Sequence, residues 1–244
     1  MVHPEQLAAP VVEALLEQEA VAFVYGQGSA FAGFVDAADL DLVVVWHRLP
    51  ARRIGGPEVS ASFEGATYVL DKLAGEVDVM HFTRDTFTSW CEELSWREEV
   101  WPQPLYVVGG FVHGRVLADP QGHAQKLLQS LQTPAPWFVA QVTDSLRDGL
   151  GGYRTELQAC ARRGDHWLFN RLTDRLLRHC YITWFALEGH YCPFPKHLPQ
   201  WIQRLGLSSE LAELHDAVWA TPDLHGRAQA LEAFARRLQE TSAD

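Results

Sequence analysis

The pattern of apolar and polar residues changes near the segment TPAP, residues 133–136. Before this segment, short apolar and alternating runs predict strands between helices; after it, only helical periodicity remains. We therefore predict an α+β fold. A mixed sheet flanked by helices is expected in residues 1–134, and an all-helical domain in residues 135–244.

The individual elements follow from the same pattern and from the Gly and Pro residues between them. Helices are expected over residues 5–19, from 83–85 to about 97, and over 123–131, 137–162, 165–189, 197–205, 208–219 and 225–240. Strands are expected over residues 21–26, 39–46, within 104–122, and as a hairpin over 67–82 that turns near Ala74-Gly75. Residues 48–58, RLPARRIGGPE, are expected to form a loop.

Two acidic residues open the apolar run DLDLVVVW. Residues two apart on a strand point to the same side, so Asp39 and Asp41 project together while Leu40 and Leu42 face the core. Two neighbouring carboxylates repel one another, and a shared cation removes this penalty. Mg²⁺ prefers such oxygen ligands. A solvated strand edge is the alternative interpretation of the two aspartates.

A third carboxylate stands in the second half of the expected hairpin. Asp78 lies between two valines, and Glu76 shares its face. If this strand pairs beside residues 39–46, the three carboxylates meet at one end of the sheet. Such a group can hold two metal ions for an in-line phosphoryl or nucleotidyl displacement.

A small turn precedes these strands. Gly28 allows the backbone to approach a phosphate closely, and Ser29 is expected to begin a short helix whose free N–H groups favour anions. An ordinary tight turn is the alternative interpretation of Gly28.

Together, Gly28-Ser29, Asp39-Leu40-Asp41-Leu42 and Val77-Asp78-Val79 resemble the motifs of the nucleotidyltransferase superfamily typified by DNA polymerase beta. The resemblance is strongest to its small bacterial members, including aminoglycoside nucleotidyltransferases. It implies that Asp39, Asp41 and Asp78 bind two Mg²⁺ ions and that Gly28 and Ser29 contact the triphosphate of ATP or another nucleotide. Two departures stand out: Ala32 and Ala38 occupy positions where many members carry a basic residue and a serine.

The resemblance implies a Mg²⁺-dependent enzyme that moves a nucleoside monophosphate, most simply AMP from ATP, to a hydroxyl of a small molecule. Glu76 is the first candidate for the base, and Glu98 and Glu99 are weaker ones. Lys196 is a candidate phosphate contact in the helical half, whose helices form either a wall for the acceptor or a homodimer interface. A protein or RNA acceptor, and a non-catalytic nucleotide-binding protein, remain the alternatives.

Composition and charge limit the expected binding partners and cellular location of the protein. A net charge of −11 is not typical of proteins that hold long nucleic acids, and it suits a neutral or cationic small acceptor. No apolar run reaches the roughly 20 residues of a membrane span, and the N-terminal stretch is acidic where a signal peptide is basic. We therefore expect a cytoplasmic protein. Its four cysteines form no C-x-x-C pair and are expected to be buried thiols rather than zinc ligands.

Overall fold

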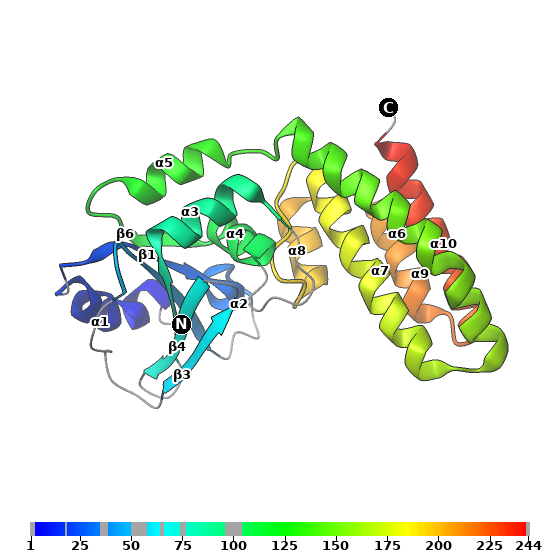
Figure 1. The fold of residues 1–244 in the computed structure, drawn as a ribbon, viewed down its shortest axis with the longest axis horizontal. Coiled ribbons are helices and arrows are strands. Elements are labelled where there is room, and N and C mark those ends of the chain that lie inside the picture. The colour runs from blue at the N-terminus through cyan, green and yellow to red at the C-terminus, as the bar shows by residue number, and fades with distance from the viewer. Residues whose placement is uncertain are drawn as a thin grey trace. The chain divides into compact units, whose positions relative to one another are not determined.

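The computed structural model describes residues 3–17, 19–34, 39–49, 58–63, 66–73, 77–95 and 104–242, and for 58–63 and 66–73 it describes the backbone. The chain divides into two compact units, Met1–Gln132 and Thr133–Asp244. The first unit contains a mixed sheet with helices, and the described part of the second unit is helical (Figure 1). The expected α+β fold class is confirmed.

The elements of the first unit alternate along the chain. Its strands are β1 (Val21–Gln27), β2 (Leu40–Trp46), β3 (Glu58–Phe63), β4 (Ala66–Leu73), β5 (Val77–Thr83) and β6 (Arg115–Ala118). Its helices are α1 (Pro4–Leu16), α2 (Gly28–Phe31), α3 (Arg84–Glu93), α4 (Pro104–His113) and α5 (His123–Ser130).

The strands form one sheet in the order β3-β4-β5-β2-β1-β6. Strands β2 and β5 are parallel, and the other neighbouring pairs are antiparallel. Strand β5 therefore lies directly beside β2, although β3 and β4 come between them in the sequence. This pairing determines which residues meet at the end of the sheet.

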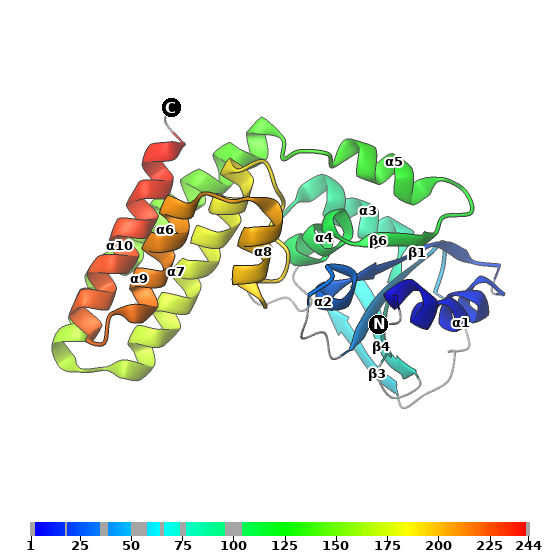
Figure 2. The ribbon, with the colours of Figure 1, turned by 180° about the vertical axis from the view of Figure 1, so that it is seen from behind.

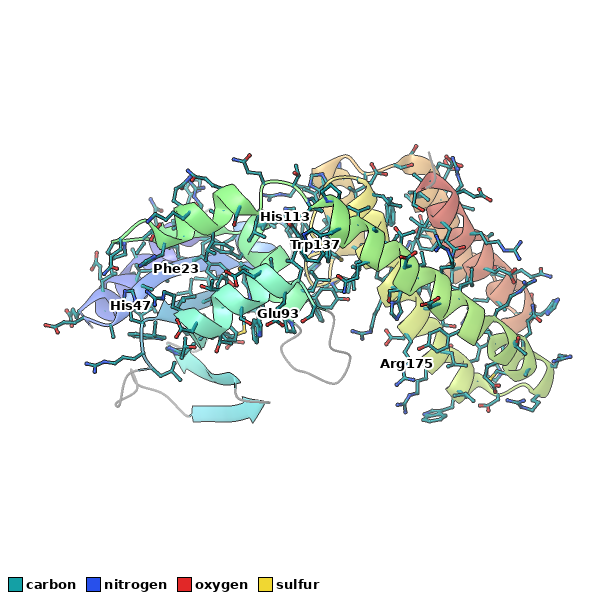
Figure 3. The ribbon with its side chains drawn as sticks, turned by 45° about the horizontal axis from the view of Figure 1, so that its top comes forward. Phe23, His47, Glu93, His113, Trp137 and Arg175 are labelled. Atoms are coloured by element: carbon teal, nitrogen blue, oxygen red, sulfur yellow. The ribbon has the colours of Figure 1, made fainter. Side chains whose placement is uncertain are left out.

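Both faces of the central strands are covered. On one face, Leu15 of α1 and Leu42 of β2 belong to the same fully buried cluster. On the other face, the Phe23 ring of β1 lies 5.5 Å from that of Phe87 in α3 and 5.6 Å from that of Phe111 in α4, between centroids (Figure 3). Apolar residues at nearly every position of β1 and β2 are therefore needed, since a strand buried on both sides has no solvent face.

Three features of this unit differ from the expectations. Strand β3 was not predicted. Helix α4 occupies the first half of the segment 104–122, where only the strand now seen as β6 was expected. Its residues from Pro104 to Gly109 and Phe111 are all buried, and such an apolar run carries no clear period. Helix α3 ends at Glu93 rather than near 97, because Leu94 adopts the left-handed conformation with φ 46°.

The second unit contains α6 (Pro136–Arg163), α7 (His166–Leu187), α8 (Leu198–Leu205), α9 (Ser209–Ala220) and α10 (Leu224–Thr241). Figure 2 shows α6, α7, α9 and α10 side by side. The helices match the predicted ranges closely because their ends carry clear signals. Gly164 ends α6 with φ 66°, and the Asp165 side chain begins α7 by accepting a hydrogen bond from the Leu168 backbone N–H at 3.1 Å. No helix in the described residues is long and apolar enough to cross a membrane.

Candidate metal centre

Two acidic side chains meet because β2 and β5 are parallel neighbours. Asp41 and Asp78 are partners in the register of this pair, followed by the partners Leu42 and Val79. Partners in register point to the same face of a sheet. The leucine and the valine enter the buried cluster over α1, so the aspartates lie on the opposite face.

Asp39 completes a group of three. It lies one residue before β2, and Asp39, Asp41 and Asp78 each offer one carboxylate oxygen within 4.8 Å of the others. All three residues are half-buried. Oxygen ligands on opposite sides of an octahedral Mg²⁺ ion are about 4.2 Å apart. The spacing therefore fits carboxylates that share a divalent cation, and this triad can hold a metal ion.

The position of the triad along the strands explains how the fold tolerates it. From Leu42 to Trp46, β2 is fully buried, whereas Asp41 is only half-buried. On β5, Asp78 is likewise half-buried between two buried valines. Asp41 and Asp78 thus lie at the edge of the core, where solvent reaches their carboxylates, and their buried apolar neighbours fix the backbone.

The turn after β1 packs directly against this group. Gln27 is the register partner of Asp41 across the antiparallel pair of β1 and β2. Gly28, the next residue, has φ +77°, and a Cβ placed on it would overlap the Asp41 carboxylate. Glycine is therefore required twice at this position, for its backbone conformation and for the close approach.

Helix α2 is very short and begins at Gly28 rather than at Ser29. The side chain of Ser29 is buried. Gly33, with φ +72°, ends the turn, and its N–H and that of Phe34 donate to the carbonyls of Ala30 and Ser29 at 3.0 and 2.9 Å. Ala32 is 6% exposed, so its apolar side chain suits this position.

Helix α4 supports the same end of β1, and sequence reasoning missed this contact. A Cβ on Gly110 would overlap the side-chain oxygen of Gln27, and one on Gly114 would overlap the carbonyl oxygen of Gly26. The two glycines therefore allow α4 and the residue after it to lie directly on the turn. The pair Gly109-Gly110, followed by Gly114, was the available signal, but it reads equally well as a loop.

Several predicted site residues are not brought to the triad by the described structure. Glu76, Ala38, Glu98 and Glu99 lie outside the described residues. Lys196 is exposed and belongs to the second unit, before α8. Roles for the glutamates and for the lysine therefore stay predictions.

Two buried ionisable groups of the first unit, Tyr25 and Cys91, are neutral parts of its core. Burial raises the pKa of Tyr25, on β1, well above its ordinary value. Burial, and secondarily Glu92, raises the pKa of Cys91 to about 12. All four cysteines are free and buried, and among the described residues only the aspartate triad groups three or more potential metal ligands.

No protein-family model matches the sequence, and no curated protein matches it. Among solved structures, the fold is similar to that of a nucleotidyltransferase-like protein from Exiguobacterium sibiricum 255-15. The two chains superpose with a TM-score of 0.49 and 14% sequence identity, over 97% of this chain and 74% of that one. This similarity is too distant to assign an activity, which has to be inferred from the site.

Proposed function

We propose that this protein is a Mg²⁺-dependent nucleotidyltransferase that transfers a nucleoside monophosphate, AMP from ATP in the simplest case, to a hydroxyl of a small molecule. The supporting observation is that Asp39, Asp41 and Asp78 offer oxygens within 4.8 Å of one another at the end of the sheet. Three clustered carboxylates repel one another unless cations neutralise them. Hard oxygen ligands of this kind select Mg²⁺, which is usually completed by substrate phosphates and water.

In the proposed reaction, the acceptor oxygen forms a bond to the α-phosphorus, and the bond from this phosphorus to the bridging oxygen of the β-phosphate breaks. Pyrophosphate leaves with the electron pair, and the hydroxyl proton passes to a base. Bound divalent ions supply activation of the hydroxyl and neutralisation of the charge on the leaving group. In this proposal Asp39 and Asp41 would hold both ions, and Asp78 would hold mainly the ion that activates the hydroxyl.

The turn at Gly28 and Ser29 is the proposed triphosphate contact. The contact between Gly28 and the Asp41 carboxylate supports this role, because it keeps the turn beside the ligands of the ions that would carry the triphosphate. Glu76 as the base completes the proposal. The net charge of −11 favours a neutral or cationic acceptor, as an aminoglycoside-like molecule would be.

The test measures pyrophosphate release from MgATP over a panel of hydroxyl-bearing acceptors. We expect Asp39→Asn, Asp41→Asn and Asp78→Asn each to lower the rate by at least about 100-fold, because each loses a ligand to the catalytic ions. Asp85→Asn is the matched control, since the side chain of Asp85 is 87% exposed on α3. Wild-type rates in the three triad variants would refute the metal assignment.

Two further measurements separate the alternatives. Labelled ATP incubated with cell lysate reports the acceptor class, and label on protein or RNA would replace the small-molecule acceptor. Calorimetry with ATP and Mg²⁺ reports nucleotide binding independently of any acceptor. Binding without pyrophosphate release on any acceptor would favour a non-catalytic nucleotide-binding protein.

A further inference from the structure

A second group of ionisable side chains lies at the opposite end of the strands from the aspartate triad. His47 directly follows β2 and comes six residues after Asp41. At about 3.3 Å per strand residue, this separation is about 20 Å. Figure 3 labels His47 at the outer edge of the first unit. The group is therefore distinct from the candidate metal centre.

Three elements contribute to the group. Arg84, the first residue of α3, places its Nη1 atom 3.5 Å from His47 Nδ1. His123, the first residue of α5, places its ring 5.4 Å from that of His47, between centroids, at 75°. Lys126 lies three residues further along α5, on the same side of the helix. In a chain with a net charge of −11, four basic side chains are gathered here.

One ring nitrogen of His47, Nε2, is a hydrogen-bond donor without an acceptor in the described part of the chain. A guanidinium group only donates, so Nδ1 of His47 accepts from Arg84 and the ring proton of neutral His47 lies on Nε2. This Nε2 atom is buried and has no hydrogen-bond partner in the described part of the chain. A buried N–H without an acceptor is unfavourable. An anionic oxygen would supply the acceptor.

The starts of two helices reinforce the positive character of the group. Both α3 and α5 begin at one of its residues, and helix N-termini carry partial positive charge. Helix α5 follows Gly122, which has φ 70° and no side chain, while Asp119 accepts from the Gln125 backbone N–H in its first turn. The start of α5 therefore adds the side chains of His123 and Lys126 to the group, together with the first two backbone N–H groups of the helix.

Two acidic side chains lie near the group. Asp119 Oδ2 accepts a hydrogen bond from the Gln125 backbone N–H at 3.0 Å, whereas its Oδ1 atom is buried without a hydrogen-bond partner in the described part of the chain. Asp85 is 87% exposed and lies 3.5 Å from Arg84. Two adjacent imidazoles also suggest a metal ion, but the guanidinium beside His47 would repel it. Among the described residues, no third metal ligand joins the two histidines.

We propose that His47, Arg84, His123 and Lys126 form a second binding site, which takes a phosphate-type oxyanion. Arg84, Lys126 and His47 Nε2–H donate to its oxygens. Burial, followed by the charges of His47, Arg84 and Lys126, lowers the pKa of His123, while Asp119 opposes them. An anion among these groups reverses the repulsion, so its binding and the protonation of His123 favour each other. Binding is therefore stronger at lower pH.

The test follows the histidine ring signals by NMR while inorganic phosphate is added, with EDTA present to keep the aspartate triad free of metal. Titrations run at about pH 6 and about pH 8, on either side of the ordinary histidine pKa. The variants His47→Gln and His123→Gln assign the two signals. We expect both signals to move with one saturation curve, with tighter binding at the lower pH. Pyrophosphate and a nucleoside monophosphate, added in the same way, show whether the site takes a free anion or a phosphate group on a larger molecule.

Arg84→Gln and Lys126→Gln should each weaken phosphate binding about tenfold, the effect of one lost charge-assisted hydrogen bond. Arg147→Gln is the matched control, because Arg147 is an exposed arginine of the second unit paired with Asp144 at 2.7 Å. The side chain of Arg84 is 42% exposed, so its replacement leaves the core intact, and circular dichroism verifies this. The proposal is overturned if neither signal saturates, if the other histidines shift in the same way, or if both charge variants bind like the wild type.

Discussion

The backbone of Gly28 lies against the carboxylate of Asp41, close enough that a methyl group on the glycine would overlap a carboxylate oxygen. Gly28 follows β1, and Asp41 lies on the neighbouring strand β2, where it is the register partner of Gln27. The turn and the candidate metal ligand are therefore mechanically linked. A side chain at position 28 has to displace either the turn or the carboxylate.

This contact predicts a large effect for Gly28→Ala. The alanine would have to adopt a left-handed backbone conformation at φ +77°, and its Cβ would overlap the Asp41 carboxylate. Both the affinity for divalent ions and the turnover should therefore fall. Gly33→Ala separates the two causes, because Gly33 has φ +72° but no atom of the described residues within 4 Å of its would-be Cβ. The control should lose only the conformational cost of about 1–2 kcal/mol. Unfolding in urea and Mn²⁺ titration by electron paramagnetic resonance measure the two quantities.

Equal losses of stability in the two glycine variants, together with unchanged Mn²⁺ affinity in Gly28→Ala, would contradict the proposed coupling. In that case the turn would adjust without moving Asp41. A loss of ion affinity in Gly28→Ala alone would support it.

The triad also predicts that divalent ions stabilise the first unit. A ligand that binds only the folded state adds about 1.4 kcal/mol when its free concentration is ten times the dissociation constant. Mg²⁺ or Mn²⁺ should therefore raise the midpoint of thermal unfolding of the wild type, and Asp39→Asn should remove most of this rise. In EDTA the variant should be equally stable or more stable, by up to about 1 kcal/mol, because one of three like charges is gone.

Asp85→Asn provides the comparison for this experiment, since it removes one exposed carboxylate from the same unit. It should keep the full response to the ion. A wild type that shows no response, or an Asp39→Asn protein that responds fully, would rule out a metal site at the triad.

The meeting of Asp39, Asp41 and Asp78 could be anticipated because each link has a local signal. The two-residue period fixes the common side of the first two, and the alternation around Asp78 marks a second strand. Only the pairing of this strand with β2 required an assumption, and β2 and β5 are indeed neighbours. The end of α6 and the start of α7 were similarly predictable, because Gly164 ends α6 by its own left-handed backbone and Asp165 begins α7 by its own side-chain hydrogen bond.

What could not be predicted depends on contacts between segments distant in the sequence. The stretch that forms α4 is apolar almost throughout and rich in β-branched residues, so its period does not separate helix from strand. Its glycines serve contacts with Gln27 and with the Gly26 carbonyl, which no local pattern reveals. The meeting of His47 with Arg84 and His123 likewise depends on how α3 and α5 pack at the end of β2.

A histidine in the second unit provides the last prediction. His215 is buried, and its Nε2 atom accepts a hydrogen bond from the Trp219 indole N–H at 3.2 Å and lies 3.1 Å from the Tyr181 hydroxyl. An indole N–H only donates, so this nitrogen is unprotonated and Nδ1–H donates to Asp216 at 3.0 Å. A proton on Nε2 would make it a hydrogen-bond donor that faces the Trp219 N–H, which is also a donor, so this hydrogen bond would be lost.

Burial lowers the pKa of His215, and the hydrogen bond and charge of Asp216 only partly oppose it. In the unfolded chain this histidine titrates near its ordinary pKa of about 6.5. Below that pH the unfolded state binds more protons than the folded state, so the free energy of unfolding should fall as the pH drops from 6.5 toward the lowered pKa. Above 6.5 this contribution should be constant.

Urea unfolding of the whole chain, followed by Trp fluorescence across this pH range, measures the slope. His215→Gln, whose amide can still accept from Trp219, should flatten it. His225→Gln, which replaces an exposed histidine of α10, should leave it unchanged. A wild-type slope that persists in His215→Gln would assign the pH dependence to other groups.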